Sequence, residues 1–183
     1  MSRSLASLAL AGAALLFLGA CGKKSTAPQG PTSHRFLLAW GTTGPGNGQF
    51  EFPAWVAVDD SAHVYVTESL GAVETGFQQR VQKFTHDGVW VKTWGTKGSA
   101  AGQFKYPGGI AVDADGNVYV TDSARGDNDL DLGNARVQVF TGTGTFVTQW
   151  DNGFGFPTGI GVDSGGNVYV ADNLHDRIQK FSN

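Results

Sequence analysis

The chain has 183 residues, with 13 lysines and arginines, 16 aspartates and glutamates, and a formal net charge of −3. A hydrophobic content of 40% and a charged content of 16% are typical of one globular domain with an ordinary core. Because the charge is near zero and forms no basic stripe, the composition argues against nucleic acid as a partner.

The first twenty residues predict an export signal that is separate from the fold. Arg3 supplies a positive charge, and residues 5–18 form an apolar stretch that is too short and too rich in alanine and glycine to favour spanning a bilayer. The stretch ends in Leu-Gly-Ala-Cys21, which resembles the signal of bacterial lipoproteins, where the peptidase cuts before the cysteine and the thiol carries diacylglycerol. We predict a signal peptide over 1–20 and a lipid anchor in a membrane at Cys21. The alternative is an ordinary secretory signal with an incidental cysteine.

Residues 21–33 follow as the lipidated cysteine and a flexible tether. The tether lacks large apolar side chains and so cannot offset the entropy of ordering. Its first residue is Gly22 and not aspartate, which resembles lipoproteins that are passed on to the outer membrane. We therefore expect the protein in the bacterial cell envelope, at the outer membrane if the cell has one.

Residues 34–183 are built from repeats. Three segments are near copies of one another, and each places two short β-prone runs around a turn cluster such as Asp113-Ala114-Asp115-Gly116-Asn117: Pro53–Glu68, Pro107–Asp122 and Pro157–Asp172. A third run beginning with arginine follows each copy: Arg80–Phe84, Arg136–Phe140 and Arg177–Phe181. A fourth run ends in tryptophan: Trp90–Trp94 and Phe146–Trp150. The sequence thus predicts an all-β repeat protein whose unit is four strands, a, b, c and d.

The repeated sequence patterns resemble the NHL repeat, especially in the second and third copies. The shared pattern is Gly-x-Phe, Pro-x-Gly-Ile-Ala-Val-Asp, Gly-Asn-Val-Tyr-Val-x-Asp and Arg-Ile-Gln-x-Phe. The resemblance implies a β-propeller of four-stranded blades, usually six in a ring. The first copy departs from the pattern with Trp55 for glycine, Ala62-His63 for Gly-Asn and Glu68 for aspartate.

The strand count predicts three blades, which is half of a six-bladed ring. Phe36–Trp40 aligns with strand d, so that we expect twelve strands in the order d, abcd, abcd, abc. Strand a is apolar on both faces, as in a sheet that is covered on both sides, whereas the more polar strand c suits a position nearer the rim. Three blades leave two open apolar flanks, and we expect a homodimer that closes the ring. The alternative is that Phe36–Trp40 closes back on its own chain in a three-bladed ring.

The d-to-a and b-to-c connections should emerge on one face, which we call the loop face. Compared with the third copy, the first copy inserts seven residues between strands b and c, and the second inserts nine. Variable loops on a rigid repeat are the usual place for binding, although exposed loops also tolerate insertions without function. We predict that the loop face binds the ligand.

The second b-to-c loop contains a candidate calcium site. Asp127, Asp129 and Asp131 place a carboxylate at every second residue, and Ca²⁺ prefers several oxygen ligands from one short loop. Calcium is the one cofactor that the sequence suggests. The alternative is a solvated acidic loop.

An acid and an arginine bracket every b-to-c loop: Glu68 and Arg80, Asp122 and Arg136, Asp172 and Arg177. Because a unique active site needs no threefold copy, we interpret these pairs as ties within each blade. The four histidines fall at different points of the repeat and have no metal-ligand spacing: His34, His63, His86 and His175. The sequence favours a membrane-anchored binding or scaffolding module for a protein, peptide or glycan. The alternatives are a metal-dependent hydrolase or lyase that uses the propeller channel, and a truncated six-bladed propeller without independent function.

Overall fold

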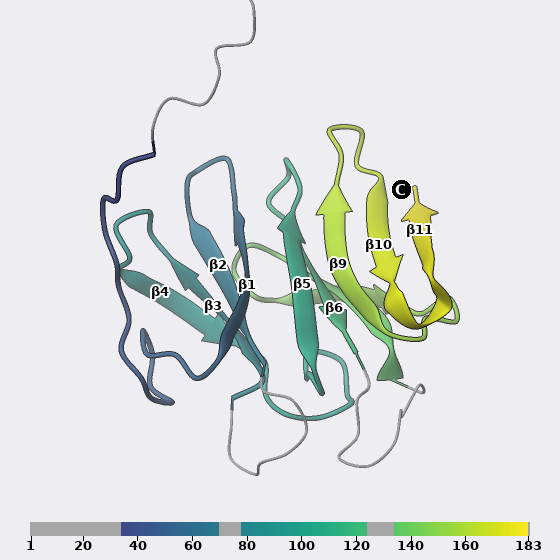
Figure 1. Ribbon diagram of the computed structural model, residues 1–183, viewed down its shortest axis with the longest axis horizontal. Coiled ribbons are helices and arrows are strands. Elements are labelled where there is room, and N and C mark those ends of the chain that lie inside the picture. Colours follow the sequence, from purple (N-terminus) through teal and green to yellow (C-terminus); the bar gives the residue numbers. More distant parts are fainter. Residues whose placement is uncertain (1–33, 70–77, 124–133, 183) are drawn as a thin grey trace, which may run out of the picture. The chain divides into compact units, whose positions relative to one another are not determined.

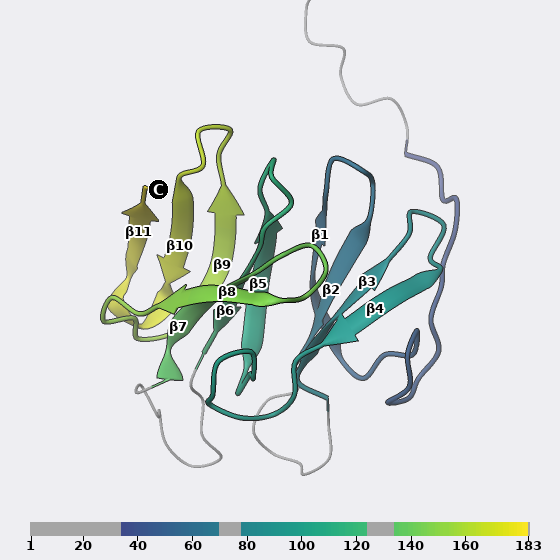
Figure 2. The same ribbon diagram turned by 180° about the vertical axis from the view of Figure 1, so that it is seen from behind.

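The computed structural model describes residues 34–69, 78–123 and 134–182, and the account below concerns those residues. They contain eleven strands in three antiparallel sheets, all of which lie in the compact unit that begins at Leu38 (Figures 1 and 2). No helix in the described ranges is long and apolar enough to cross a membrane. The prediction of an all-β fold made of separate blades is confirmed.

Each sheet is one blade, in which every strand pairs with the next one along the chain. Blade 1 consists of β1 (Pro53–Val58), β2 (Val64–Glu68), β3 (Arg80–Phe84) and β4 (Trp90–Trp94). Blade 2 consists of β5 (Pro107–Val112), β6 (Val118–Asp122), β7 (Arg136–Phe140) and β8 (Phe146–Trp150). Blade 3 consists of β9 (Pro157–Val162), β10 (Val168–Asp172) and β11 (Arg177–Phe181).

An aspartate organises the turn between the first two strands of each blade. In blade 2, Asp113 Oδ1 accepts hydrogen bonds from the backbone N–H of Asp115 at 3.0 Å and of Asn117 at 2.8 Å. Blade 1 makes the same turn, although Ala62 replaces the glycine and takes a φ of 61° where Gly116 has 81°. The departure of the first copy from the repeat pattern therefore leaves the turn intact at the cost of a left-handed alanine.

The core lies between neighbouring blades. β1, β5 and β9 lie side by side in both views, with β5 in the middle (Figures 1 and 2). Blade 1 packs on blade 2 through Trp94, whose ring centroid lies 6.1 Å from that of Phe140. Blade 2 packs on blade 3 through Trp150, 5.5 Å from Phe181. The recurring aromatic residues thus join one blade to the next.

The structure corrects the expected number of strands. Residues 36–40 form no strand, so the order is abcd, abcd, abc, and blade 3 has three strands. A strand needs the free edge of another strand for its backbone hydrogen bonds, and within the described residues no edge pairs with residues 36–40. Trp40 nevertheless packs on Phe84 at 6.1 Å, as Trp94 packs on Phe140.

Strand c holds the third place in its sheet, as expected, but its polar glutamines are not exposed at the rim. Gln82 in β3 and Gln138 in β7 are fully buried. Gln138 accepts a hydrogen bond from Gly102 N–H at 2.9 Å and donates one to the carbonyl oxygen of Gln103 at 2.7 Å. These glutamines bind the d-to-a loop of their own blade from inside, because buried backbone groups need partners.

Candidate binding face

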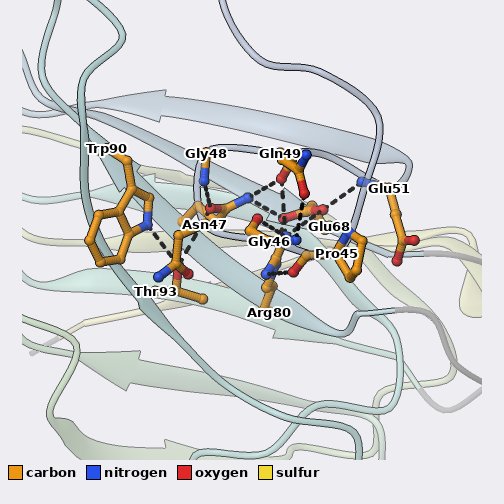
Figure 3. A network of polar contacts seen from close by, with 11 residues as sticks. Pro45, Gly46, Asn47, Gly48, Gln49, Glu51, Glu68, Arg80, Trp90 and Thr93 are labelled. Carbon is orange, nitrogen blue, oxygen red and sulfur yellow. Dashed lines mark hydrogen bonds and ion pairs between the residues drawn. The ribbon is translucent and has the colours of Figure 1, made fainter.

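The loop face is where strand b ends and strand c begins, and its frame is a repeated network of polar contacts. In blade 1 the network centres on Glu68 and Arg80, which face each other at the ends of β2 and β3 (Figure 3). Arg80 Nε donates to Glu68 Oε1 at 2.7 Å, and the side chains of both residues are buried. The pair therefore closes the base of the b-to-c loop.

The same arginine also holds the segment that leads into β1, which takes the place of a d-to-a loop in this blade. Arg80 Nη1 donates to the carbonyl oxygen of Pro45 at 2.7 Å, and Nη2 donates to that of Gln49 at 3.0 Å (Figure 3). Glu68 Oε2 accepts from the backbone N–H of Glu51 at 2.7 Å. One ion pair thus fixes both connections that emerge on this face of the blade.

Blade 2 repeats this arrangement with a shorter acid. Asp122 Oδ2 accepts from Arg136 Nη2 at 3.0 Å, and both side chains are buried. Arg136 Nη1 donates to the carbonyl oxygen of Ser99 at 2.7 Å, and Asn134 Nδ2 donates to Asp122 Oδ2 at 3.0 Å. Lys105 N–H donates to Asp122 Oδ1 at 2.9 Å, so the d-to-a loop is fixed here as well.

Blade 3 keeps the pair but covers it less. Asp172 Oδ2 accepts from Arg177 Nε at 3.0 Å, and Arg177 Nη2 donates to the carbonyl oxygen of Gly153 at 2.9 Å. His175 Nδ1 lies 2.9 Å from Asp172 Oδ2. The Asp172 side chain is fully buried, whereas 45% of the Arg177 side chain is exposed, against 7% for Arg136.

Comparison with known proteins places these blades in a family context. The family model of the NHL repeat matches residues 104–127 and 154–181. "NHL repeat-containing protein 3" of Mus musculus is 33% identical over 113 residues, which cover 61% of this chain and 29% of that protein. Its Homo sapiens counterpart is 30% identical over 107 residues, which cover 58% of this chain and 27% of that protein. These matches support the NHL repeat family. The matching part spans less than a third of the length of either relative.

Solved structures that resemble the chain support the same fold. A gluconolactonase from Xanthomonas campestris aligns with a TM-score of 0.51 and 17% identity, over 75% of this chain and 45% of that chain. A putative exported protein from Bacteroides fragilis aligns with a TM-score of 0.52 and 14% identity, over 77% of this chain and 40% of that chain. At this identity the likeness concerns the fold alone, and it confirms the β-propeller class.

The acids of blades 2 and 3 have different electrostatic surroundings. Burial raises the pKa of Asp122, and the Tyr106 N–H and the Arg136 guanidinium oppose that rise only in part. Burial also acts to raise the pKa of Asp172, but hydrogen bonds from His175, Gly155 N–H and Arg177 outweigh it and hold that pKa below its usual range. The surroundings of Asp172 in blade 3 therefore favour its charged carboxylate form. Those of Asp122 in blade 2 disfavour the charged form, because burial outweighs its hydrogen bonds and its ion pair.

Several predicted site residues lie outside the described residues. These are Cys21 and the calcium candidates Asp127, Asp129 and Asp131, together with most of the two long b-to-c loops. Among the residues that are described, no group of three or more histidines, cysteines, aspartates and glutamates could hold a metal ion. The calcium site thus remains a prediction from the sequence.

His86 pairs with its neighbour Asp87 at 3.3 Å, and two other histidines contact acids at fixed places of the repeat. His63 takes the place of asparagine in the first turn, and its Nδ1 lies 3.1 Å from Asp59 Oδ2. His175 contacts Asp172 at the base of the short loop of blade 3. Each of these two rings therefore adds one contact to an aspartate that already binds other groups of its turn or loop.

Sequence reasoning missed the glutamines of strand c as members of the site. Gln82 Nε2 donates to Glu68 Oε1 at 2.6 Å, and Gln179 Nε2 donates to Asp172 Oδ2 at 3.3 Å. The signal was visible, because a glutamine stands two residues after the arginine in all three copies. A polar residue at a fixed place in a repeat indicates a repeated hydrogen bond at least as strongly as it indicates solvent exposure.

Proposed function

We propose that the protein is a membrane-anchored binding or scaffolding module of the bacterial envelope, which presents its loop face to a protein, peptide or glycan. The observation that carries this proposal is the acid–arginine pair at the base of every b-to-c loop, in which the acid is fully buried. Each pair fixes the two ends of its loop, whatever the length or sequence of the loop between them.

The hydrogen-bond networks support a rigid set of loop ends that carries loops of different length and sequence. In blades 1 and 2 the arginine also binds carbonyl groups of the d-to-a loop, so the two connections of a blade are held in one position. The loops that these frames carry differ by several residues between copies. A rigid frame with variable loops reduces the conformational entropy that binding would cost, because the loop ends are already fixed.

The anchor would keep the bladed domain near a membrane surface. Cys21 stands where the lipoprotein signal requires it, and the residues up to position 33 would serve as the tether. A single acyl chain gives only marginal binding, so the two or three chains of a bacterial lipoprotein would provide the stable attachment. The proposed ligand is therefore a component that lies within reach of the membrane.

Photo-crosslinking from two ends of blade 2 tests the binding proposal. A photoreactive residue is placed at Asn128, in the long b-to-c loop, and in a matched variant at Asp115, in the turn at the other end of the blade. We expect a specific adduct from position 128 that excess unlabelled protein suppresses, and none from position 115. Replacing the other residues of 124–133 by a Gly-Ser linker of equal length, with the photoreactive residue kept at position 128, should remove the adduct without changing the near-ultraviolet circular dichroism. Equal labelling from both positions, or an adduct that survives the loop replacement, would overturn the proposal.

A further inference from the structure

In the described residues the outer edge of blade 3 pairs with no strand, and a groove with both apolar and polar walls lies next to it. β11 pairs with β10 and, in the described part of the chain, has no strand on its other side. A groove of about 690 Å³ lies beside it, and its walls include Val147, Trp150 and Phe181. In blade 2 the corresponding place is filled by β8 and the turn before it, where Phe146 packs on Phe140 at 6.0 Å. The groove therefore lies where a fourth strand of blade 3 would run, with room for an aromatic side chain at the place that Phe146 takes in blade 2.

The outer flanks of blades 1 and 3 expose residues that the inner blade interfaces bury. Val56 in β1 is 62% exposed, whereas Ile110, at the same position of β5, is 6% exposed. On the other flank, Ile178 in β11 is 67% exposed, whereas Val137, at the same position of β7, is fully buried. These flanks therefore present apolar surface that a further blade would cover, as neighbouring blades do at the inner interfaces.

The packing of Trp40 shows which contacts a preceding blade would make with blade 1. Trp94 ends strand d of blade 1 and packs on Phe140 and on the turn at Gly144 of blade 2, where an added Cβ would lie 2.8 Å from the indole ring. Trp40 packs in the same way on Phe84 and on the turn at Gly88, where an added Cβ would lie 2.5 Å from its ring. Trp40 thus occupies the end of a strand d that belongs to a blade preceding blade 1.

We propose that this preceding blade is blade 3 of a second copy of the chain. Residues 36–40 of one copy form the fourth strand on β11 of the other, and Phe36 enters the groove beside Phe181. The two contacts are equivalent, so a half turn relates the copies and closes the ring. The surface of each new interface continues the blade-to-blade packing that the chain already makes twice within itself.

The pairing of β7 with β8 gives the register of the exchanged strand. Val139 faces Thr148 in that pair, and the corresponding residues are Lys180 in β11 and Leu38 of the second copy. The new interface lacks one contact of the inner interfaces. Thr67 and Thr121 donate to carbonyl oxygens of the next blade, at 3.0 and 2.8 Å, and Ala171 stands at the same place in blade 3. Assembly therefore depends on the added strand and on apolar contact.

Disulfide trapping tests the proposal on the full chain. Leu38→Cys and Lys180→Cys are combined, the protein is oxidised in cell lysate, and the chain is detected by antibody on a non-reducing gel. Residues that face each other in antiparallel strands have Cα atoms about 4.5–5.5 Å apart, which suits a disulfide bond. We expect a covalent dimer from the double variant. Each single-cysteine variant controls for bonds through Cys21, the only natural cysteine.

Two further substitutions make the outcome specific to the exchanged strand. Phe36→Asp, added to the cysteine pair, should raise the dissociation constant of the dimer at least about 30-fold and remove the dimer band, because buried aromatic residues dominate interfaces. Val89→Asp changes an exposed residue between β3 and β4 in the same chemical way and should leave the band unchanged. An intrachain disulfide would show that the strand closes on its own chain, and free thiols would show that β11 takes no such strand. Either result overturns the proposal.

Discussion

Replacing Arg136 by methionine should destabilise blade 2 strongly, because it leaves the carboxylate of Asp122 buried without its ion partner. Methionine keeps much of the aliphatic volume of the arginine stem, so the change isolates the charge and its hydrogen bonds. Removing one partner of a buried ion pair costs about 3–5 kcal/mol. The loss should lie in this range because both side chains are buried and Arg136 also binds the carbonyl groups of Ser99 and Gln103.

The size of that loss should depend on pH. Burial already raises the pKa of Asp122, and loss of the Arg136 charge raises it further. A carboxyl group whose pKa is higher in the folded than in the unfolded state destabilises the fold above that pKa, and the penalty disappears as the pH falls and the group takes up a proton. The difference between wild type and variant should therefore shrink between pH 7 and pH 5.

Urea unfolding at both pH values measures the effect, and Asp122→Asn provides the control. In the Arg136→Met background this second substitution removes the buried charge, so it should recover part of the lost stability at pH 7 and abolish the extra pH dependence. A loss below about 1 kcal/mol at pH 7, the lower limit for one buried unpaired group, would refute the reasoning. So would a double variant that is no more stable than Arg136→Met.

Four further predictions follow from the sequence and the turns. Cys21→Ser should release the protein from the membrane fraction or leave it unprocessed, and a wild type that already fractionates as soluble would contradict the anchor. Millimolar Ca²⁺ should raise the melting temperature if Asp127, Asp129 and Asp131 bind it, and Asp129→Ala should remove that shift, which differential scanning fluorimetry detects. Ala62→Gly should stabilise the fold by roughly 1 kcal/mol, because it relieves a left-handed alanine at φ 61°, and a loss in urea unfolding would contradict this. The lowered pKa of Asp172 contributes stability above pH 3.8 that is lost as the pH falls, so Asp172→Asn should be less stable than wild type at pH 7 and lose less stability on acidification.

The blade architecture could be predicted because each strand and turn carries a local signal. The alternation around Ile110–Val112 and Val118–Val120, and the Asp113–Asn117 turn between them, specify a hairpin without any distant contact. Repetition strengthens this prediction, because the same pattern of strands and turns occurs three times at matching positions. The same argument explains why Ala62 did not disturb the prediction of the first blade.

What the sequence could not give was the environment of its polar residues. A glutamine in strand c looks the same whether it faces solvent or a buried loop, and only packing reveals that Gln138 binds Gly102 and Gln103. Residues 36–40 form no strand for a related reason. The sequence pattern shows which side chains suit a strand d, whereas a strand also needs an edge to pair with, and in the described residues no edge pairs with this segment.

The proposed assembly would change how the loop face binds a ligand. In a ring of two copies, each long b-to-c loop would occur twice on the same face, related by a half turn. A ligand with two equivalent epitopes could then bind both copies at once, and its second contact would be intramolecular. Such a ring would prefer repetitive ligands, such as a glycan chain or a symmetric protein, over small monovalent ones. Phe36→Asp should therefore weaken binding of a repetitive ligand far more than binding of a single epitope, because it separates the two loop sets without changing either of them.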